Sequence, residues 1–189
     1  MIRRAVERLA VPAATALLLA AASSACTRVS TQEARHLVER YNRAVCEAYR
    51  RGDPRLVDAV VGPREGKKLT GLIGVRLDLG LTLDAELTLL EVSNAERIGD
   101  QLHVWTHETW RYRDRRIGSG EQVGEESTDA YEMLYRFVRL DGDWKVDAIE
   151  FTKDPAVGRR TSPWAAPAEV LHGIETQAPA APDKERGNP

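Results

Sequence analysis

The sequence predicts an α+β domain in which N-terminal helices pack on a mainly antiparallel sheet of about four strands. Apolar residues recur at three- and four-residue steps in the first part of the chain, which is the helical period, and at two-residue steps after about residue 81. The pair Asp141-Gly142 then separates two alternating runs and is typical of a two-residue hairpin turn. Helices followed by an antiparallel meander define this class.

The first helix is predicted to begin at residue 31. Ser30 and Glu33 have the spacing of a capping box, in which each side chain bonds the backbone N–H of the other residue. One apolar stripe then continues for about five turns. Gly52 ends the helix, and Asp53-Pro54 starts a second, short one. The stripe consists of Ala34, Leu37, Val38, Tyr41, Val45, Ala48 and Tyr49.

Residues 64–81 fit two descriptions. The odd-numbered positions from Val75 to Leu83 are mostly apolar and alternate like a strand. Two glycines within the segment would each weaken a helix by roughly 1 kcal/mol. We nevertheless favour a helix to about Leu79, because a second set of apolar residues has helical spacing: Leu69, Leu72, Ile73 and Leu77.

Four strands follow, at about residues 85–95, 102–114, 128–140 and 144–152. In the first strand, we expect Ala85, Leu87 and Leu89 to share the apolar face. Asp129 and Asp147 lie near strand ends and are expected to be solvated. The third strand presents four large side chains on one face: Tyr131, Met133, Tyr135 and Phe137.

The N-terminus has the form of a bacterial lipoprotein signal. Residues 1–25 combine a positively charged start, an uncharged apolar run and small residues, which is typical of a secretory signal and not of a membrane span. The ending Ser23-Ser24-Ala25-Cys26 resembles a lipobox, and the resemblance implies that Cys26 is lipidated and becomes the first residue of the mature chain. A plain secretory signal with an incidental cysteine is the alternative.

The resulting organisation is a signal peptide (1–25), a tether (26–30), a folded domain (31–152) and a tail (153–189). The tail holds six of the nine prolines and little apolar surface, so we expect it to be largely disordered. Lipidation would hold the domain on the extracytoplasmic side of a bacterial membrane. The outer membrane is favoured where two exist, because Thr27 is not the aspartate that retains some lipoproteins at the inner membrane.

The formal net charge of −2 and the absence of a basic stripe argue against a nucleic-acid partner. Cys46 falls within the helical stripe of the first helix and is interpreted as a small buried apolar residue. No cofactor motif and no metal-ligand cluster is recognised. His103 and His107 lie four residues apart along one strand, about 13 Å, which is too far for one metal ion.

The order of elements and two motifs resemble the nuclear-transport-factor-2-like superfamily. One motif is Glu108-x-Trp110-x-Tyr112, and the other is the closing hairpin with Asp141-Gly142, Trp144 and Val146. The chain also looks like bacterial lipoproteins of that superfamily. The resemblance covers about residues 31–152 and implies a cone, in which a curved sheet wraps a long helix and leaves a pocket. It further implies that a homodimer can form by sheet packing. The catalytic residues of the superfamily's enzymes cannot be matched in this chain.

Strand alternation places Glu108 on the core face of the second strand, together with Val104, Thr106, Trp110 and Tyr112. A carboxylate there must be paired, hydrogen-bonded, neutral or in a wet pocket. We favour an ion pair with an arginine of the covering helices. Ligand binding and general-base chemistry are the alternatives. The three arginines considered are Arg40, Arg43 and Arg76.

The sequence therefore predicts a membrane-anchored lipoprotein whose domain binds a small apolar ligand or an envelope protein without catalysing a reaction. The second hypothesis is an isomerase or dehydratase that uses Glu108 with a tyrosine hydroxyl as donor. The third is a structural component of the envelope. The candidate pocket residues are Glu108, Trp110, Tyr112, Tyr131 and Tyr135.

Overall fold

The computed structural model describes residues 29–152. The predictions for the signal peptide, for Cys26 and for the residues after 152 lie outside this range. Within it, none of the helices is both long and apolar enough to span a membrane. The fold is α+β, as predicted, with helices first and a single sheet after them.

The helices form where the sequence predicts them. Helix α1 spans Thr31–Arg51, and the Ser30 hydroxyl accepts a hydrogen bond from the Glu33 backbone N–H at 3.1 Å. Gly52 ends the helix at a positive φ of 66°, a conformation that glycine adopts without steric cost. A 3₁₀ turn, η1, covers Pro54–Val57 and is capped by Asp53. Helix α2 spans Pro63–Asp78, so the helical interpretation of this segment is confirmed.

The sheet contains four antiparallel strands in the order β1-β2-β3-β4. They are β1 (Leu81–Ile98), β2 (Gln101–Arg116), β3 (Gln122–Leu140) and β4 (Asp143–Phe151). Both Asp141 and Gly142 have positive φ, as a two-residue hairpin requires. The first three strands are longer than predicted, because strand pairing continues past the ends of the apolar alternation.

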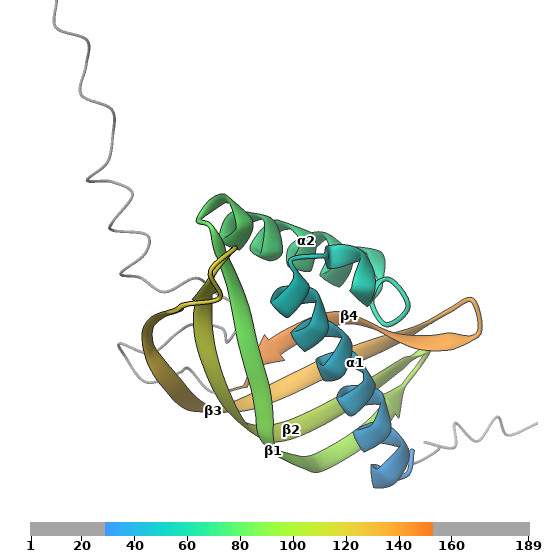
Figure 1. The fold of residues 1–189 in the computed structure, drawn as a ribbon. Coiled ribbons are helices and arrows are strands. Elements are labelled where there is room, and N and C mark those ends of the chain that lie inside the picture. The colour runs from blue at the N-terminus through green and yellow to red at the C-terminus, as the bar shows by residue number, and fades with distance from the viewer. Residues whose placement is uncertain (1–28, 153–189) are drawn as a thin grey trace, which may run out of the picture.

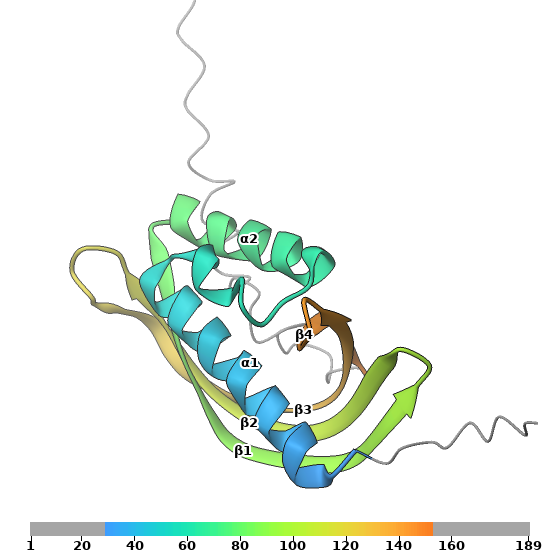
Figure 2. The same cartoon turned by 90° about the vertical axis from the view of Figure 1, so that its right-hand side faces the viewer.

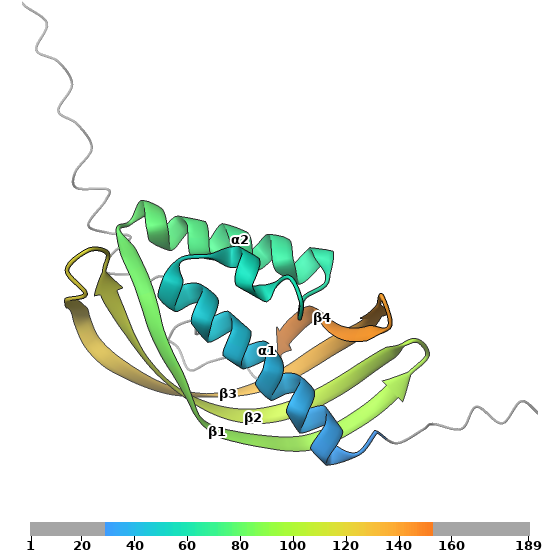
Figure 3. The same ribbon diagram turned by 45° about the vertical axis from the view of Figure 1, so that its right-hand side comes forward.

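Both helices lie on the concave side of the sheet (Figure 1, Figure 2). The strands curve around α1, and α2 lies farther from the sheet (Figure 3). A parallel bridge between Val61 and Val146 fixes the start of α2 to β4 through two backbone hydrogen bonds, at 2.7 and 2.9 Å. This arrangement is the cone predicted from the sequence, and its interior holds the core.

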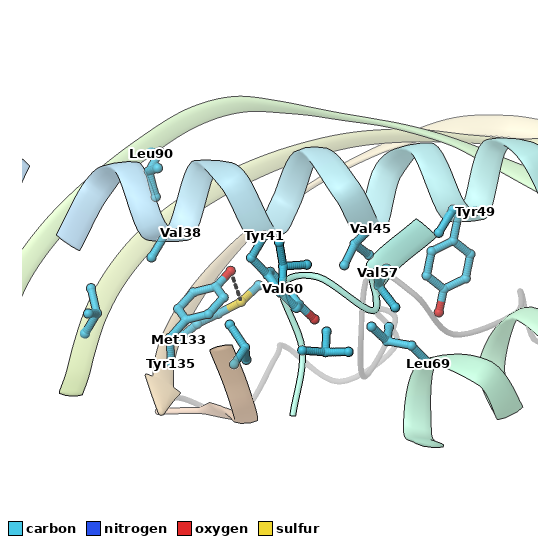
Figure 4. Close-up of a cluster of buried hydrophobic side chains, with 14 of the residues drawn as sticks. Val38, Tyr41, Val45, Tyr49, Val57, Val60, Leu69, Leu90, Met133 and Tyr135 are labelled. Atoms are coloured by element: carbon cyan, nitrogen blue, oxygen red, sulfur yellow. Dashed lines mark hydrogen bonds between the residues drawn. The ribbon is translucent and has the colours of Figure 1, made fainter. Parts of the chain in front are cut away.

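The core forms between the apolar stripe of α1 and the concave face of the sheet. Val38, Tyr41 and Val45 point from α1 toward the interior, where Met133 and Tyr135 meet them (Figure 4). The rings of Tyr41 and Tyr135 pack edge to face with centroids 5.8 Å apart, a favourable aromatic geometry. Six of the seven predicted stripe residues are buried, and Leu37 is half-buried.

Strand β1 departs from the predicted alternation. The pairing of β1 with β2 shifts between Leu87 and Leu89. An extra residue in one strand turns the following side chains to the opposite face. Leu90 is therefore buried in the core, while Leu89 is 46% exposed. The prediction that Leu89 shares the apolar face of Ala85 and Leu87 is wrong for this reason.

Candidate functional site

Strand β2 places its side chains on two faces, as predicted. Its core-facing residues, from Val104 to Tyr112 in steps of two, are each at most 1% exposed. His103 and His107 lie on the opposite face, where His103 is half-buried and the His107 side chain is 48% exposed. Glu108 is thus a carboxyl group inside an aromatic core, and its surroundings decide what it can do.

The Glu108 carboxyl is held by three neutral donors. Thr106 and Tyr135 donate their hydroxyl hydrogens to Oε1 at 2.9 and 2.8 Å, and the Trp110 indole N–H donates to Oε2 at 2.8 Å. Thr106 and Trp110 flank Glu108 on the same face of β2, and Tyr135 comes from the neighbouring strand. Strand alternation supplies two of the donors, and the pairing of β2 with β3 supplies the third.

The predicted ion pair with an arginine is wrong. The Arg40 guanidinium donates to the Trp144 carbonyl at 2.8 Å, and Arg43 is exposed. Arg76 is buried, but it pairs with Asp114 and not with Glu108. Tyrosine, tryptophan and threonine take the place of the cation, because these neighbours can donate hydrogen bonds without bringing a second charge into the core.

Burial raises the pKa of the Glu108 carboxyl above its ordinary value of 4.5, against the opposing effect of the bonds with Tyr135, Trp110 and Thr106 and of the nearby Asn42 amide. Burial also raises the pKa of Tyr135, so the phenol keeps its hydrogen. That single hydrogen has three acceptors within reach, Glu108 Oε1 at 2.8 Å, Asn42 Oδ1 at 3.3 Å and the weaker Met133 Sδ at 3.6 Å. The shortest contact assigns it to Glu108 while the carboxyl is ionised.

Protonation changes the direction of these bonds. Oε2 accepts from the Trp110 indole, which can only donate, whereas Oε1 lies beside two hydroxyls that can also accept, so Oε1 is the oxygen from which a bound proton can be passed on. From there it can be donated to the Tyr135 hydroxyl oxygen, whose own hydrogen then turns to Asn42. Glu108, Tyr135 and Asn42 thus form a relay with two self-consistent hydrogen-bond arrangements.

A second polar cluster lies farther along the concave face. The Tyr112 hydroxyl donates to the Asp129 carboxylate and lies 2.7 Å from the Tyr131 hydroxyl. Asp129 is only 9% exposed, so the prediction that it is solvated is wrong. Strand β3 continues to Gln122, and Asp129 is therefore not near a strand end. Of the five predicted pocket residues, the structure places three in the first network and two in this cluster.

Two of the cavities that open on the described residues are well defined, and neither of these two is lined by the five predicted residues. One, of about 380 Å³, lies beside the start of α1 and includes Ser30, His36 and Arg40. The other, of about 350 Å³, lies between α1 and β1 and includes Asn42, Cys46 and Leu87. Asn42 therefore connects the Glu108 relay to the wall of the second cavity.

The residues 29–152 contain no group of three or more side chains suited to hold a metal ion. Cys46 is half-buried against the core. Burial raises the pKa of its thiol to about 12, so it does not supply a thiolate near neutral pH.

Sequence reasoning missed Asn42, which lies within the apolar stripe of α1 and is 2% exposed. Its position between Val38 and Val45 on the same helical face was the available signal. The Arg76–Asp114 pair was also missed, although strand alternation places Asp114 on the same core-facing side of β2 as Tyr112.

Comparisons with known proteins concern the fold alone. No family model matches the chain, and a search of curated protein sequences finds no match either. The intermembrane space region of chloroplast protein ARC6 is similar at a TM-score of 0.58, with 16% identity, 66% of this chain and 97% of that chain covered.

Two further solved structures are more distant. A nuclear transport factor 2-like superfamily protein from Salmonella enterica serovar Typhimurium has a TM-score of 0.45 and 12% identity, with 69% of this chain and 96% of that chain covered. A putative dehydratase of that family from Streptomyces avermitilis has a TM-score of 0.44 and 16% identity, covering 68% and 100%. The α+β cone is confirmed by the arrangement of helices and sheet, and similar structures include proteins of the superfamily named in the prediction.

Proposed function

We propose that the chain is a lipoprotein anchored through Cys26, whose cone domain binds an envelope protein or a small apolar ligand without catalysing a reaction. The observation that favours a role without catalysis is the Glu108 network. Its carboxyl oxygens receive three hydrogen bonds from the domain's own core, and the side chain is 1% exposed. A general base must come within hydrogen-bond reach of its substrate. Glu108 instead uses its acceptors to join β2 to β3.

Anchoring at Cys26 would hold the domain close to the membrane. Ser30 caps the helix, so at most four residues separate Cys26 from the first ordered turn. An extended chain covers about 3.5 Å per residue, which would hold the cone within about 15 Å of the bilayer surface. A domain so close to a membrane meets envelope proteins and lipids before it meets soluble ligands, and this favours a partner in the envelope.

Mass spectrometry of the mature protein tests the anchor. We expect an N-terminal Cys26 that carries acyl chains and a protein that fractionates with membranes. Cys26→Ser should release the domain into the soluble fraction, whereas Cys46→Ser should leave it on the membrane. An unmodified N-terminus at any other residue would refute the anchoring.

Native purification followed by identification of the bound material tests the binding role. The partner or ligand should remain bound to Glu108→Gln, because this substitution keeps an oxygen acceptor for Trp110 and an amide that can donate to Tyr135. Tyr135→Phe serves as the matched variant on the other side of the same bond. If both folded variants keep the bound material, the network has a structural role.

A specific observation also favours an enzyme as the second candidate. A carboxyl with a raised pKa that lies 2.8 Å from a tyrosine hydroxyl is an arrangement that acid–base catalysis can use. In that case Glu108→Gln should abolish turnover of the identified ligand while binding persists. A turnover that survives this substitution would exclude Glu108 as the base.

A further inference from the structure

The cavity between α1 and β1 combines apolar walls with one buried polar side chain. Cys46 and Leu87 supply the apolar surface, and Asn42 is the most deeply buried of the lining residues, at 2% exposure. The volume of about 350 Å³ falls within the range of small-molecule sites. The pairing of β1 with β2 shifts beside this cavity, between Leu87 and Leu89, and such irregularities are common next to functional sites.

Asn42 has a hydrogen-bond donor that the fold does not use. Its Nδ2 is buried and makes no hydrogen bond to any residue between 29 and 152. One of its two hydrogens can be directed at the neighbouring Glu108 carboxyl, but the other has no acceptor. Buried donors without an acceptor are rare in native proteins, so this one indicates a role at the cavity.

The bond between Asn42 and Tyr135 leaves the amide free to move. The Tyr135 hydroxyl lies 3.3 Å from Asn42 Oδ1 but only 2.8 Å from Glu108 Oε1. While Glu108 is ionised, the phenol hydrogen stays with the nearer acceptor. The Asn42 side chain can then turn toward the cavity and present Nδ2 to an acceptor there, without breaking the bond between Tyr135 and Glu108.

The acceptor that fits this position is neutral. A second anion beside the buried Glu108 carboxyl would be repelled by it, because little water is present to screen the two charges. A carbonyl oxygen accepts a hydrogen bond from Asn42 without adding a charge to the core. The inner end of a ligand in this cavity should therefore carry a carbonyl group.

The outer end of the cavity favours an anion. Arg43 lines the cavity, is exposed, and has no ion-pair partner among residues 29–152. The other charged lining residues are already paired, Glu47 with Arg50 and Glu39 with Arg35. Arg43 is therefore the lining cation that can receive a carboxylate, and its guanidinium matches that group in shape.

We propose that this cavity binds an amphipathic oxo acid, a small molecule with a carboxylate at one end, a neutral carbonyl at the other and an apolar body between them. Arg43 pairs with the carboxylate, Cys46 and Leu87 pack against the body, and Asn42 donates to the carbonyl oxygen. This inference rests on the ligand-binding role proposed above and names the chemistry of that ligand. It does not depend on the membrane anchor.

Calorimetric titration with three probes tests the proposal. The protein is the chain from residue 26 with Cys26→Ser, so that no lipid is attached. The probe 7-oxooctanoate has all three features, octanoate lacks the carbonyl, and 2-octanone lacks the carboxylate. We expect 7-oxooctanoate to bind about tenfold more tightly than octanoate, because only the oxo acid satisfies the buried donor. It should bind about threefold more tightly than 2-octanone, because the pair with Arg43 is exposed.

Two variants assign the contacts to residues. Asn42→Leu removes the donor at similar volume, and it should bring the affinities of 7-oxooctanoate and octanoate within about twofold of each other. Arg43→Gln should weaken 7-oxooctanoate about threefold and leave 2-octanone unchanged. Arg64→Gln is the matched control, because it removes an exposed charge from α2 outside the cavity, and it should change neither affinity.

The proposal is overturned if 7-oxooctanoate does not bind, if octanoate binds equally well, or if folded Asn42→Leu keeps the full preference for the oxo acid. Where Asn42→Leu does not fold, the comparison of probes in the parent chain decides. These failures would leave the binding of an envelope protein untouched, because native purification tests that role separately.

Discussion

Glu108 and Asp114 are two acids of strand β2 whose side chains both face the core, yet the fold accommodates them in different ways. Both are at most 2% exposed. Asp114 meets the guanidinium of Arg76, which α2 brings over the sheet and which also lies 5.8 Å from the centroid of the Tyr49 ring. Glu108 is bonded instead by uncharged groups, among them two hydroxyls and an indole N–H. The comparison shows that one strand can bury two acids, one matched by the charge of a helix arginine and the other by uncharged hydrogen-bond donors.

Breaking the charged pair should have the largest effect. Arg76→Met leaves Asp114 buried without its cation, and the free energy of unfolding should fall by about 3–5 kcal/mol. Urea denaturation measures this loss. The double variant Arg76→Met with Asp114→Leu should regain much of the stability, because neither charge is then left alone. A double variant as unstable as Arg76→Met would show that Arg76 stabilises the fold through its packing and not through its charge.

Removing one donor of Glu108 should have a smaller effect. Tyr135→Phe leaves the carboxyl one bond short, at a cost of about 1–3 kcal/mol in the free energy of unfolding. Tyr41→Phe is the control, since the Tyr41 hydroxyl donates to Glu65, whose carboxylate also contacts Lys68. It should cost less, because Glu65 keeps a cationic partner. Equal losses in the two variants would contradict the special dependence of Glu108 on Tyr135.

Glu108 should also make the stability of the fold depend on pH. Its carboxyl binds a proton more tightly in the folded chain than in the unfolded chain, because burial raises its pKa above 4.5. Its contribution to stability is therefore fully present below about pH 4.5 and is lost as the pH rises through the higher folded value. Denaturation of the parent chain and of Glu108→Gln across this range should show the parent losing stability relative to the variant. Parallel curves would contradict the raised pKa.

A substitution on the outer face of the sheet should change the stability of the fold least. Arg136 and Glu150 form an ion pair at 2.8 Å, with side chains 36% and 45% exposed. Such pairs contribute less than about 1 kcal/mol and are screened by salt. Glu150→Gln should therefore change the unfolding midpoint only slightly, and less so in high salt. A loss as large as that of Tyr135→Phe would mean that this face is covered by a partner.

Much of the fold follows from local patterns. The Ser30 cap, the Gly52 stop and the Asp141-Gly142 turn each depend on a few adjacent residues, and all three occur as predicted. The face assignment of β2 was right because strand alternation needs no information from elsewhere. The shifted register in β1 could not be seen, since one extra residue leaves the composition of the strand unchanged.

The partners of the buried acids were harder to predict. Arg76 was among the arginines considered, but alternation gives only the face of an acid and not the position of a helix above it. Glu108 was expected to bind an arginine, but the acid that does is Asp114, six residues farther along β2. Asp129 was misplaced because the strand containing it extends beyond its apolar stretch. Tertiary contact, not local propensity, decides these cases.

The bond between Trp110 and Glu108 has a practical consequence. Trp110 is 0% exposed, and its indole N–H donates to Oε2 of the Glu108 carboxyl. The nuclear magnetic resonance of that one indole proton should move as the carboxyl gains or loses its charge. It provides a built-in spectroscopic probe, by which the interior of the cone can be titrated without a label, an added dye or a known ligand.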